Sequence, residues 1–125
     1  MPPKITNVKL VRCTENGTET LSGDYAKLSF NWTAGITENG TVNTNTNLNI
    51  RAVINDDSEI GSHIIEYEET GLTDQNGLIE NNILSSQILY FNPGSVTITI
   101  LDVIANQSFS TTAYIPEGGF PIHIS

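Results

Sequence analysis

The sequence is poor in cysteine. Cys13 is the single cysteine among the 125 residues, so no disulfide can form within the chain. The fold must therefore be stable without a covalent cross-link, which suits synthesis in a reducing cytosol. A lone cysteine could serve as a reactive thiol, but burial as a small hydrophobic side chain is the commoner role. We therefore expect Cys13 to be buried.

Basic residues are also scarce. The chain has five of them against 14 acidic residues, and its formal net charge is −9. Proteins that bind nucleic acid or anionic membranes neutralise phosphates with clustered Lys and Arg side chains, and this sequence has no basic stripe. No apolar run approaches the roughly 20 residues of a membrane span. We therefore expect no nucleic-acid partner and no membrane insertion.

The usual signatures of catalysis are missing. There is no Gly-x-Ser-x-Gly elbow, no phosphate loop and no dinucleotide fingerprint. His63 and His123 are too far apart for the short spacing of a zinc pair. We therefore expect no catalytic residues and no cofactor, and we predict that the domain is not an enzyme.

Two acidic stretches are the candidate metal sites. Neither has the bidentate glutamate that a calcium loop requires at its twelfth position. We interpret both as solvated turns and expect no metal ion at either of them. The two sets of residues are Asp56, Asp57 and Glu59 in the first stretch, and Asp74, Asn76 and Glu80 in the second.

What the sequence does contain is strict alternation of apolar and polar residues. In the stretch "YAKLSFNWTA", which starts at Tyr25, every second position from Ala26 onward is apolar: Ala26, Leu28, Phe30 and Trp32. This period of two is typical of a half-buried strand. We predict a strand over Tyr25–Thr33 with Trp32 in the core. The same pattern predicts strands over Leu48–Ile54, Val96–Ile100 and Phe109–Ile115.

Three further segments favour strands less clearly. Ile5–Cys13 is apolar but its alternation slips, which indicates a β-bulge or a switch between sheets. His63–Glu68 predicts a short strand, and Ile83–Phe91 predicts a strand from its residue types. The stretch "GLTDQNGLIENN" between them predicts a long connection. About seven short strands separated by turns are typical of an all-β two-sheet sandwich.

Tyrosines on the strand surface could stack on sugars. Tyr25 and Tyr114 have outward parity on their strands, and Tyr90 lies in the apolar run of ambiguous parity. Surface tyrosines are common on strands because tyrosine has a high β-propensity. The pattern therefore leaves sugar binding open without locating a site.

Two stretches carry a resemblance to a known group. "ITNVKLVRCTENGTETLSGDYAKLSF" resembles the start of an immunoglobulin-like module in tail proteins of phages of Gram-positive, streptococcal-type bacteria. The matching positions are Arg12-Cys13, Gly17 and Gly23-Asp24-Tyr25. "VTITILDVIANQSFSTTAYIPEGGFPIHIS" is similar to the end of such modules, through Val96–Asp102, Ser108–Thr112, Pro116 and Phe120-Pro121. The two stretches cover about half of the chain.

The resemblance implies an immunoglobulin/fibronectin III-like sandwich of about seven antiparallel strands over residues 1–119. Residues 120–125 would begin a linker or strand that leads to a further domain. The implied function is structural, in a tail tip, fibre or host-adsorption apparatus that spaces or presents receptor-binding parts. The protein would be made in the host bacterial cytoplasm and reside in the virion tail.

The implied partners are other domains or subunits of the tail, with a host cell-surface glycan as a further candidate. No catalytic residue follows from the resemblance, because its motifs encode strands and turns. Two other classes remain open. One is a bacterial surface adhesin or cell-wall repeat domain, and the other is a small carbohydrate-binding module.

Overall fold

The computed structural model describes residues 1–55 and 64–119, and these residues form strands and turns without a helix. Alternating apolar and β-branched residues pair into antiparallel ladders throughout. The strands are β1 (Lys4–Cys13), β2 (Tyr25–Thr33), β3 (Leu48–Asn55), β4 (Ile64–Leu72), β5 (Asn76–Ile83), β6 (Ser95–Asp102) and β7 (Gln107–Tyr114). The all-β prediction is confirmed.

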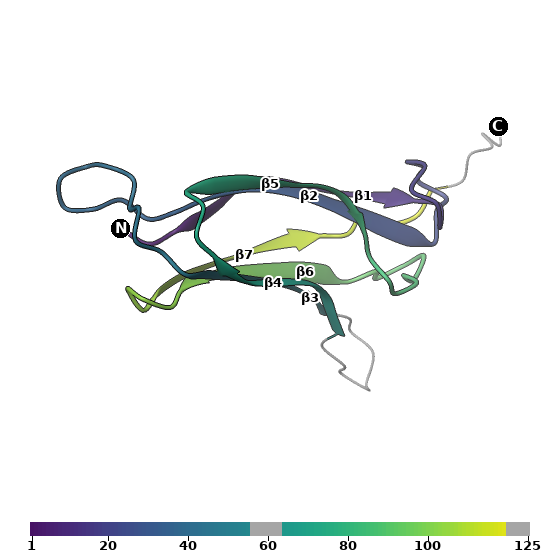
Figure 1. The fold of residues 1–125 in the computed structure, drawn as a ribbon. Helices are drawn as coiled ribbons and strands as arrows, with labels where there is room; N and C mark the ends of the chain where they lie inside the picture. Colours follow the sequence, from purple (N-terminus) through teal and green to yellow (C-terminus); the bar gives the residue numbers. More distant parts are fainter. Residues whose placement is uncertain (56–63, 120–125) are drawn as a thin grey trace.

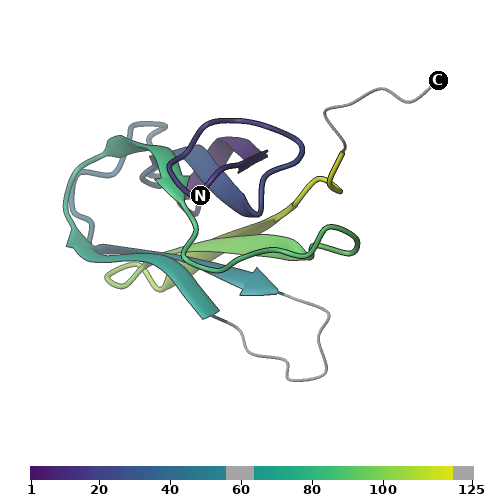
Figure 2. The same ribbon diagram turned by 90° about the vertical axis from the view of Figure 1, so that its right-hand side faces the viewer.

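The strands form two facing layers (Figure 1). One sheet has three strands in the order β1-β2-β5, and the other has four in the order β4-β3-β6-β7. Turned by 90°, the molecule shows the chain crossing from β4 in one layer to β5 in the other along one side (Figure 2). This arrangement leaves β1, β5, β4 and β7 as the sheet edges.

The core lies between the two sheets. Leu28 and Phe30 from β2 and Ile98 and Ile100 from β6 are fully buried there, and Trp32 is only 4% exposed. The burial of Trp32 agrees with its predicted place in the core. The ring of Phe30 meets Tyr67 of β4 edge to face, with centroids 6.1 Å apart, a favoured geometry for aromatic pairs.

The slipped alternation of β1 comes from a β-bulge. The pairing of β1 with β2 shifts between Thr6 and Lys9, and Asn7 within this bulge has a φ of 53°. The side-chain amide of Asn7 donates to the amide oxygen of Asn31 over 3.1 Å. Because the bulge adds one residue, Ile5 before it and Leu10 after it both face the core.

Two predictions between residues 71 and 91 are wrong. Part of the stretch predicted as a long connection forms β5, which pairs with β2 through partners such as Asn31–Leu78. The predicted strand Ile83–Phe91 is not a strand, because β5 ends at Ile83. The residues that follow have their buried side chains at Leu84 and Ile88, four apart instead of two.

The segment from Leu84 to Gly94 crosses from one sheet to the other. The amides of Leu84 and Ile88 donate to the carbonyls of Ala26 and Asp24. Glu66 of β4 fixes the start of the segment, because its carboxylate accepts hydrogen bonds from the backbone amide and hydroxyl of Ser85 and from the hydroxyl of Ser86. The crossing is therefore ordered by hydrogen bonds to both sheets.

Candidate functional site

The most unusual side chain is Arg12, near the end of β1. It is 1% exposed although it carries a full charge. The bulge in β1 gives Arg12 the same inward parity as Leu10, so the chain places a guanidinium at a core position. A buried charge is costly unless its hydrogen-bonding groups are satisfied. Arg12 therefore needs acceptors from the surrounding segments.

Four backbone carbonyls supply these acceptors. Nε of Arg12 donates to the carbonyl of Pro116 over 2.6 Å, and Nη1 donates to that of Gly23 over 2.9 Å. Nη2 donates to the carbonyls of Leu89 and Tyr90, the latter at 3.0 Å. One side chain thereby joins the β1–β2 loop, the crossing segment and the segment after β7. We call Arg12 and its four acceptor residues the Arg12 cluster.

The electrostatics of the cluster combine burial with nearby negative groups. Burial lowers the pKa of Arg12, while the charges of Asp24, Tyr90 and Glu117 act in the opposite direction. The guanidinium also lies 5.8 Å from the centroid of the Tyr90 ring, within the range of a cation–π contact. Arg12 is thus held by carbonyl dipoles, an aromatic ring and nearby carboxylates, and this arrangement is suited to fixing loops.

Gly23 is required by a close backbone approach within the cluster. A β-carbon at this position would lie 2.0 Å from the carbonyl oxygen of Cys13. Cys13 itself is 0% exposed, and burial raises the pKa of its thiol. The thiol therefore lacks the exposure and the lowered pKa of a reactive cysteine, which agrees with its predicted burial.

The segment after β7 completes the cluster. The amide of Gly118 donates to the carbonyl of Tyr90 and that of Gly119 to the carbonyl of Leu21, both over 2.9 Å. The ring of Tyr90 lies against Gly118, where a β-carbon would be 2.4 Å from it. The residues after β7 are thereby attached to two loops at one end of the sandwich.

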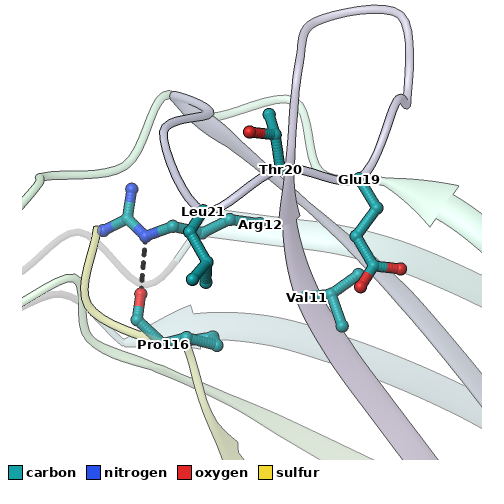
Figure 3. A pocket seen from close by; sticks show the side chains of 6 residues that line it. All are labelled: Val11, Arg12, Glu19, Thr20, Leu21 and Pro116. Carbon is teal, nitrogen blue, oxygen red and sulfur yellow. Dashed lines mark hydrogen bonds between the residues drawn. The ribbon is translucent and has the colours of Figure 1, made fainter. Parts of the chain in front are cut away.

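A shallow pocket of about 270 Å³ lies beside Arg12 (Figure 3). The Arg12 guanidinium and the Glu19 carboxylate lie on opposite sides of it. Glu19 is 3.9 Å from Lys9 in an exposed ion pair. The lining is mainly apolar and aliphatic, and we assign it no acid–base chemistry. It is made of Val11, Arg12, Glu19, Thr20, Leu21 and Pro116.

A second pocket of about 270 Å³ lies on the outer face of the four-stranded sheet. Its charged groups are Arg51 of β3 and Glu68 of β4. Nε and Nη2 of Arg51 both donate to Oε2 of Glu68, at 2.9 and 2.6 Å. This pairing satisfies both groups at the surface, and the pocket presents mainly threonine, asparagine and aliphatic side chains around them.

The candidate metal ligands are not brought together where they are described. Asp74, Asn76 and Glu80 are exposed in the β4–β5 turn and along β5. Within residues 1–55 and 64–119, no group of three His, Cys, Asp or Glu side chains could hold a metal ion. The remaining candidates lie outside the described residues, namely Asp56, Asp57, Glu59, His63 and His123.

The three candidate sugar-stacking tyrosines lie in different settings. Tyr114 on β7 is 78% exposed, whereas Tyr25 and Tyr90 are half-buried. Tyr90 contacts Arg12 and makes an edge-to-face contact with Phe91 at 4.8 Å. The packing of Tyr90 therefore belongs to the Arg12 cluster.

Sequence reasoning missed the role of Arg12. A signal was present, because Arg12 has the parity of Val8 and Leu10 in an apolar strand. A charged residue at a core position indicates a buried, hydrogen-bonded group. The carbonyls that bind it come from residues up to 104 positions away, and the sequence gives no sign of them.

Comparisons with known proteins give no relative. No family model matches the chain, and neither a curated protein nor a solved structure matches it. Among the described residues there is no helix long and apolar enough to cross a membrane.

Proposed function

We propose that this domain is a non-catalytic structural module of a phage tail, in the tip, fibre or host-adsorption apparatus. The observation that carries the proposal is where the resembling residues lie. Arg12, Gly23 and Pro116 come from the two separate stretches of the resemblance, and the Arg12 side chain donates hydrogen bonds to the carbonyls of the other two. The shared pattern thus corresponds to one physical unit that joins three segments.

The strand order supports the finer assignment to an immunoglobulin/fibronectin III-like sandwich. If β1 to β7 are lettered A to G, the sheets are A-B-E and D-C-F-G. Constant-type immunoglobulin domains have the sheets A-B-E-D and C-F-G. The two arrangements differ only in which sheet the fourth strand joins.

The positions of Met1 and of the described segment after β7 support a spacing role. Met1 lies at one end of the sandwich and the segment after β7 at the other (Figure 1). Met1 forms backbone hydrogen bonds with Ile36, whereas Pro116 accepts from Arg12 near the far end of β1. β1 has ten residues, and at about 3.3 Å per residue it spans roughly 30 Å. Such a domain separates whatever is attached at its two ends by about its own length.

In this proposal the partners are other domains or subunits of the tail, and the protein resides in the virion. A host-cell glycan is a candidate receptor for the assembled tail. The role that we propose for this domain is spacing and presentation of the receptor-binding parts.

Immunogold electron microscopy tests the assignment. Antibodies raised against the purified domain are applied to virions of the phage whose genome encodes it and, in parallel, to uninfected host bacteria. We expect gold particles on the tail and bare cell walls, with pre-immune serum as the control. Labelled cell walls and bare virions would overturn the proposal and favour the bacterial surface adhesin.

A further inference from the structure

The edge strand β7 is chemically different from the other three edge strands. A sheet edge presents unpaired backbone groups, and proteins usually protect it with charged side chains, proline or bulges. β7 has the sequence QSFSTTAY, which contains no charged residue, proline or glycine. Its pairing with β6 runs without a register shift from Asp102–Gln107 to Ser95–Tyr114. The edge is therefore long, regular and uncharged.

The other edges each carry protection. β1 has the bulge near Asn7 and two exposed lysines, Lys4 and Lys9. β4 has two register shifts and is rich in glutamate. β5 has a register shift in its pairing with β2 and carries Glu80. Among the described edge strands, only β7 pairs along its whole length without a register shift and also lacks a charged residue.

We propose that β7 is a self-association edge, at which two copies of this chain pair antiparallel through β7. The two four-stranded sheets then join into one continuous sheet of eight strands. A two-fold axis relates the copies, so the same strand supplies both sides of the contact. This inference is independent of the proposed tail function, because it rests on the edge chemistry alone.

The charge distribution favours a second copy as the occupant. Each chain carries a net charge of −9, so two copies repel one another across most of their surfaces. The surface around this edge is an exception, because the outward positions of β6 and β7 form an uncharged strip. The strip contains Ser95, Thr97, Thr99, Leu101, Ser108, Ser110, Thr112 and Tyr114.

The side chains of the strip in one copy also match the side chains of the strip in a second copy. On its outer face, the hydroxyls of Thr97 and Thr112 form a hydrogen bond of 3.1 Å, and those of Thr99 and Ser110 form one of 2.8 Å. Directly opposite residues in an antiparallel pair lie on the same face. The two-fold axis must therefore pass through a residue position, and the two registers that pair most of β7 place it at Ser110 or at Thr111. Both registers place hydroxyl side chains opposite hydroxyl side chains, which repeats the pairing already present between β6 and β7.

The association should be weak. One strand pair buries less than the roughly 1,200 Å² that marks the lower limit of stable interfaces, so we expect a dissociation constant on the order of 100 μM. Sedimentation velocity over a concentration series up to about 1 mM, tenfold above that dissociation constant, then covers the transition from monomer to dimer. Amide hydrogen exchange adds a local readout, because β7 amides that do not bond to β6 should become protected as the concentration rises.

Two matched double variants locate the contact. Ser110→Glu with Thr112→Glu places carboxylates opposite each other in either register. Thr97→Glu with Thr99→Glu adds the same charge and removes the same two hydroxyl hydrogen bonds. Its carboxylates lie one strand further from the axis, so that they face the second copy at about 10 Å instead of about 5 Å. Circular dichroism and urea unfolding check that both variants fold.

The expected result is a wild-type dimer, a monomeric β7 variant and a β6 variant that still dimerises. A wild-type chain that remains monomeric at about 1 mM would overturn the proposal, since that concentration is tenfold above the expected constant. A dimer that survives in the β7 variant would place the contact elsewhere and also overturn it. Equal loss of dimer in both variants would indicate contact through the outer face and would reject edge pairing.

Discussion

The indole of Trp32 lies directly over Gly77, its partner across the β2–β5 pair. A β-carbon on Gly77 would fall 2.4 Å from Nε1 of Trp32. Glycine weakens a strand because it offers no side chain to pack. Here the largest side chain of the core covers the position that glycine leaves open.

Gly77→Ala should therefore destabilise the domain by about 1–3 kcal/mol, the usual cost of overpacking a well-packed site. Urea unfolding followed by circular dichroism measures this change. Leu78→Ala is the matched control, because Leu78 is the next residue on β5 and is 55% exposed. In a Trp32→Ala background the cost of Gly77→Ala should largely disappear, since the two residues contact each other. Equal costs in both backgrounds would contradict the steric explanation.

Trp32→Ala alone should cost about 3–5 kcal/mol, as for other large aromatic side chains in cores. Trp32 is the single tryptophan of the chain, so the fluorescence of the native protein reports on this site alone. Its emission should shift to longer wavelength on unfolding. A native spectrum typical of a water-exposed indole would be inconsistent with its 4% exposure.

Arg12→Lys should destabilise the domain by about 2–4 kcal/mol, because hydrogen bonds to charged groups are strong and buried carbonyls would lose their donors. An ammonium group cannot reproduce the planar fork that reaches several segments at once. Arg51→Lys is the control, and its exposed pair with Glu68 should contribute less than about 1 kcal/mol. Limited proteolysis should cut the Arg12 variant first in the loops that Arg12 joins. Equal stability losses in the two variants would show that the Arg12 cluster is unimportant.

Alkaline pH should lower the stability through Tyr67. Burial raises the pKa of Tyr67, and the negative charge of nearby Glu69 raises it further. Above the ordinary tyrosine pKa of about 10, the unfolded chain loses a proton that the folded chain retains, so stability falls as the pH rises. Tyr67→Phe should flatten this fall and keep the ring contact with Phe30. Tyr114→Phe is the control, since Tyr114 is 78% exposed. The measurement is the urea midpoint between about pH 8 and 11, spanning the ordinary tyrosine range.

Periodicity predicted the strands that have one buried face. The bounds of β2 match the prediction, and the slip within Ile5–Cys13 corresponds to the bulge at Asn7. These features depend on local alternation, which the sequence records directly. Burial of Trp32 follows from the same pattern, whereas burial of Cys13 was expected from the usual role of a lone cysteine.

Periodicity failed where neighbouring strands decide the structure. β5 contains Gly77, Asn81 and Asn82, residue types that are depleted in strands. It forms because β2 supplies its backbone partners, and Trp32 covers Gly77. The opposite error occurred at Ile83–Phe91, where only Leu84 and Ile88 are buried in the core and the residues after Ile83 form no strand. The acceptors of Arg12 were equally hidden, because all of them are backbone carbonyls.

The placement of Met1 and Gly119 at opposite ends of the sandwich has a mechanical consequence. Within residues 1–55 and 64–119, β1 and β7 are the first and last strands, and each is held to its own sheet by antiparallel hydrogen bonds along its length. A pull between Met1 and Gly119 acts nearly parallel to these strands (Figure 1). The force is therefore shared by many bonds in shear instead of opening them one at a time. The bonds of Arg12 to Pro116 and Gly23 add resistance where the load enters the final segment.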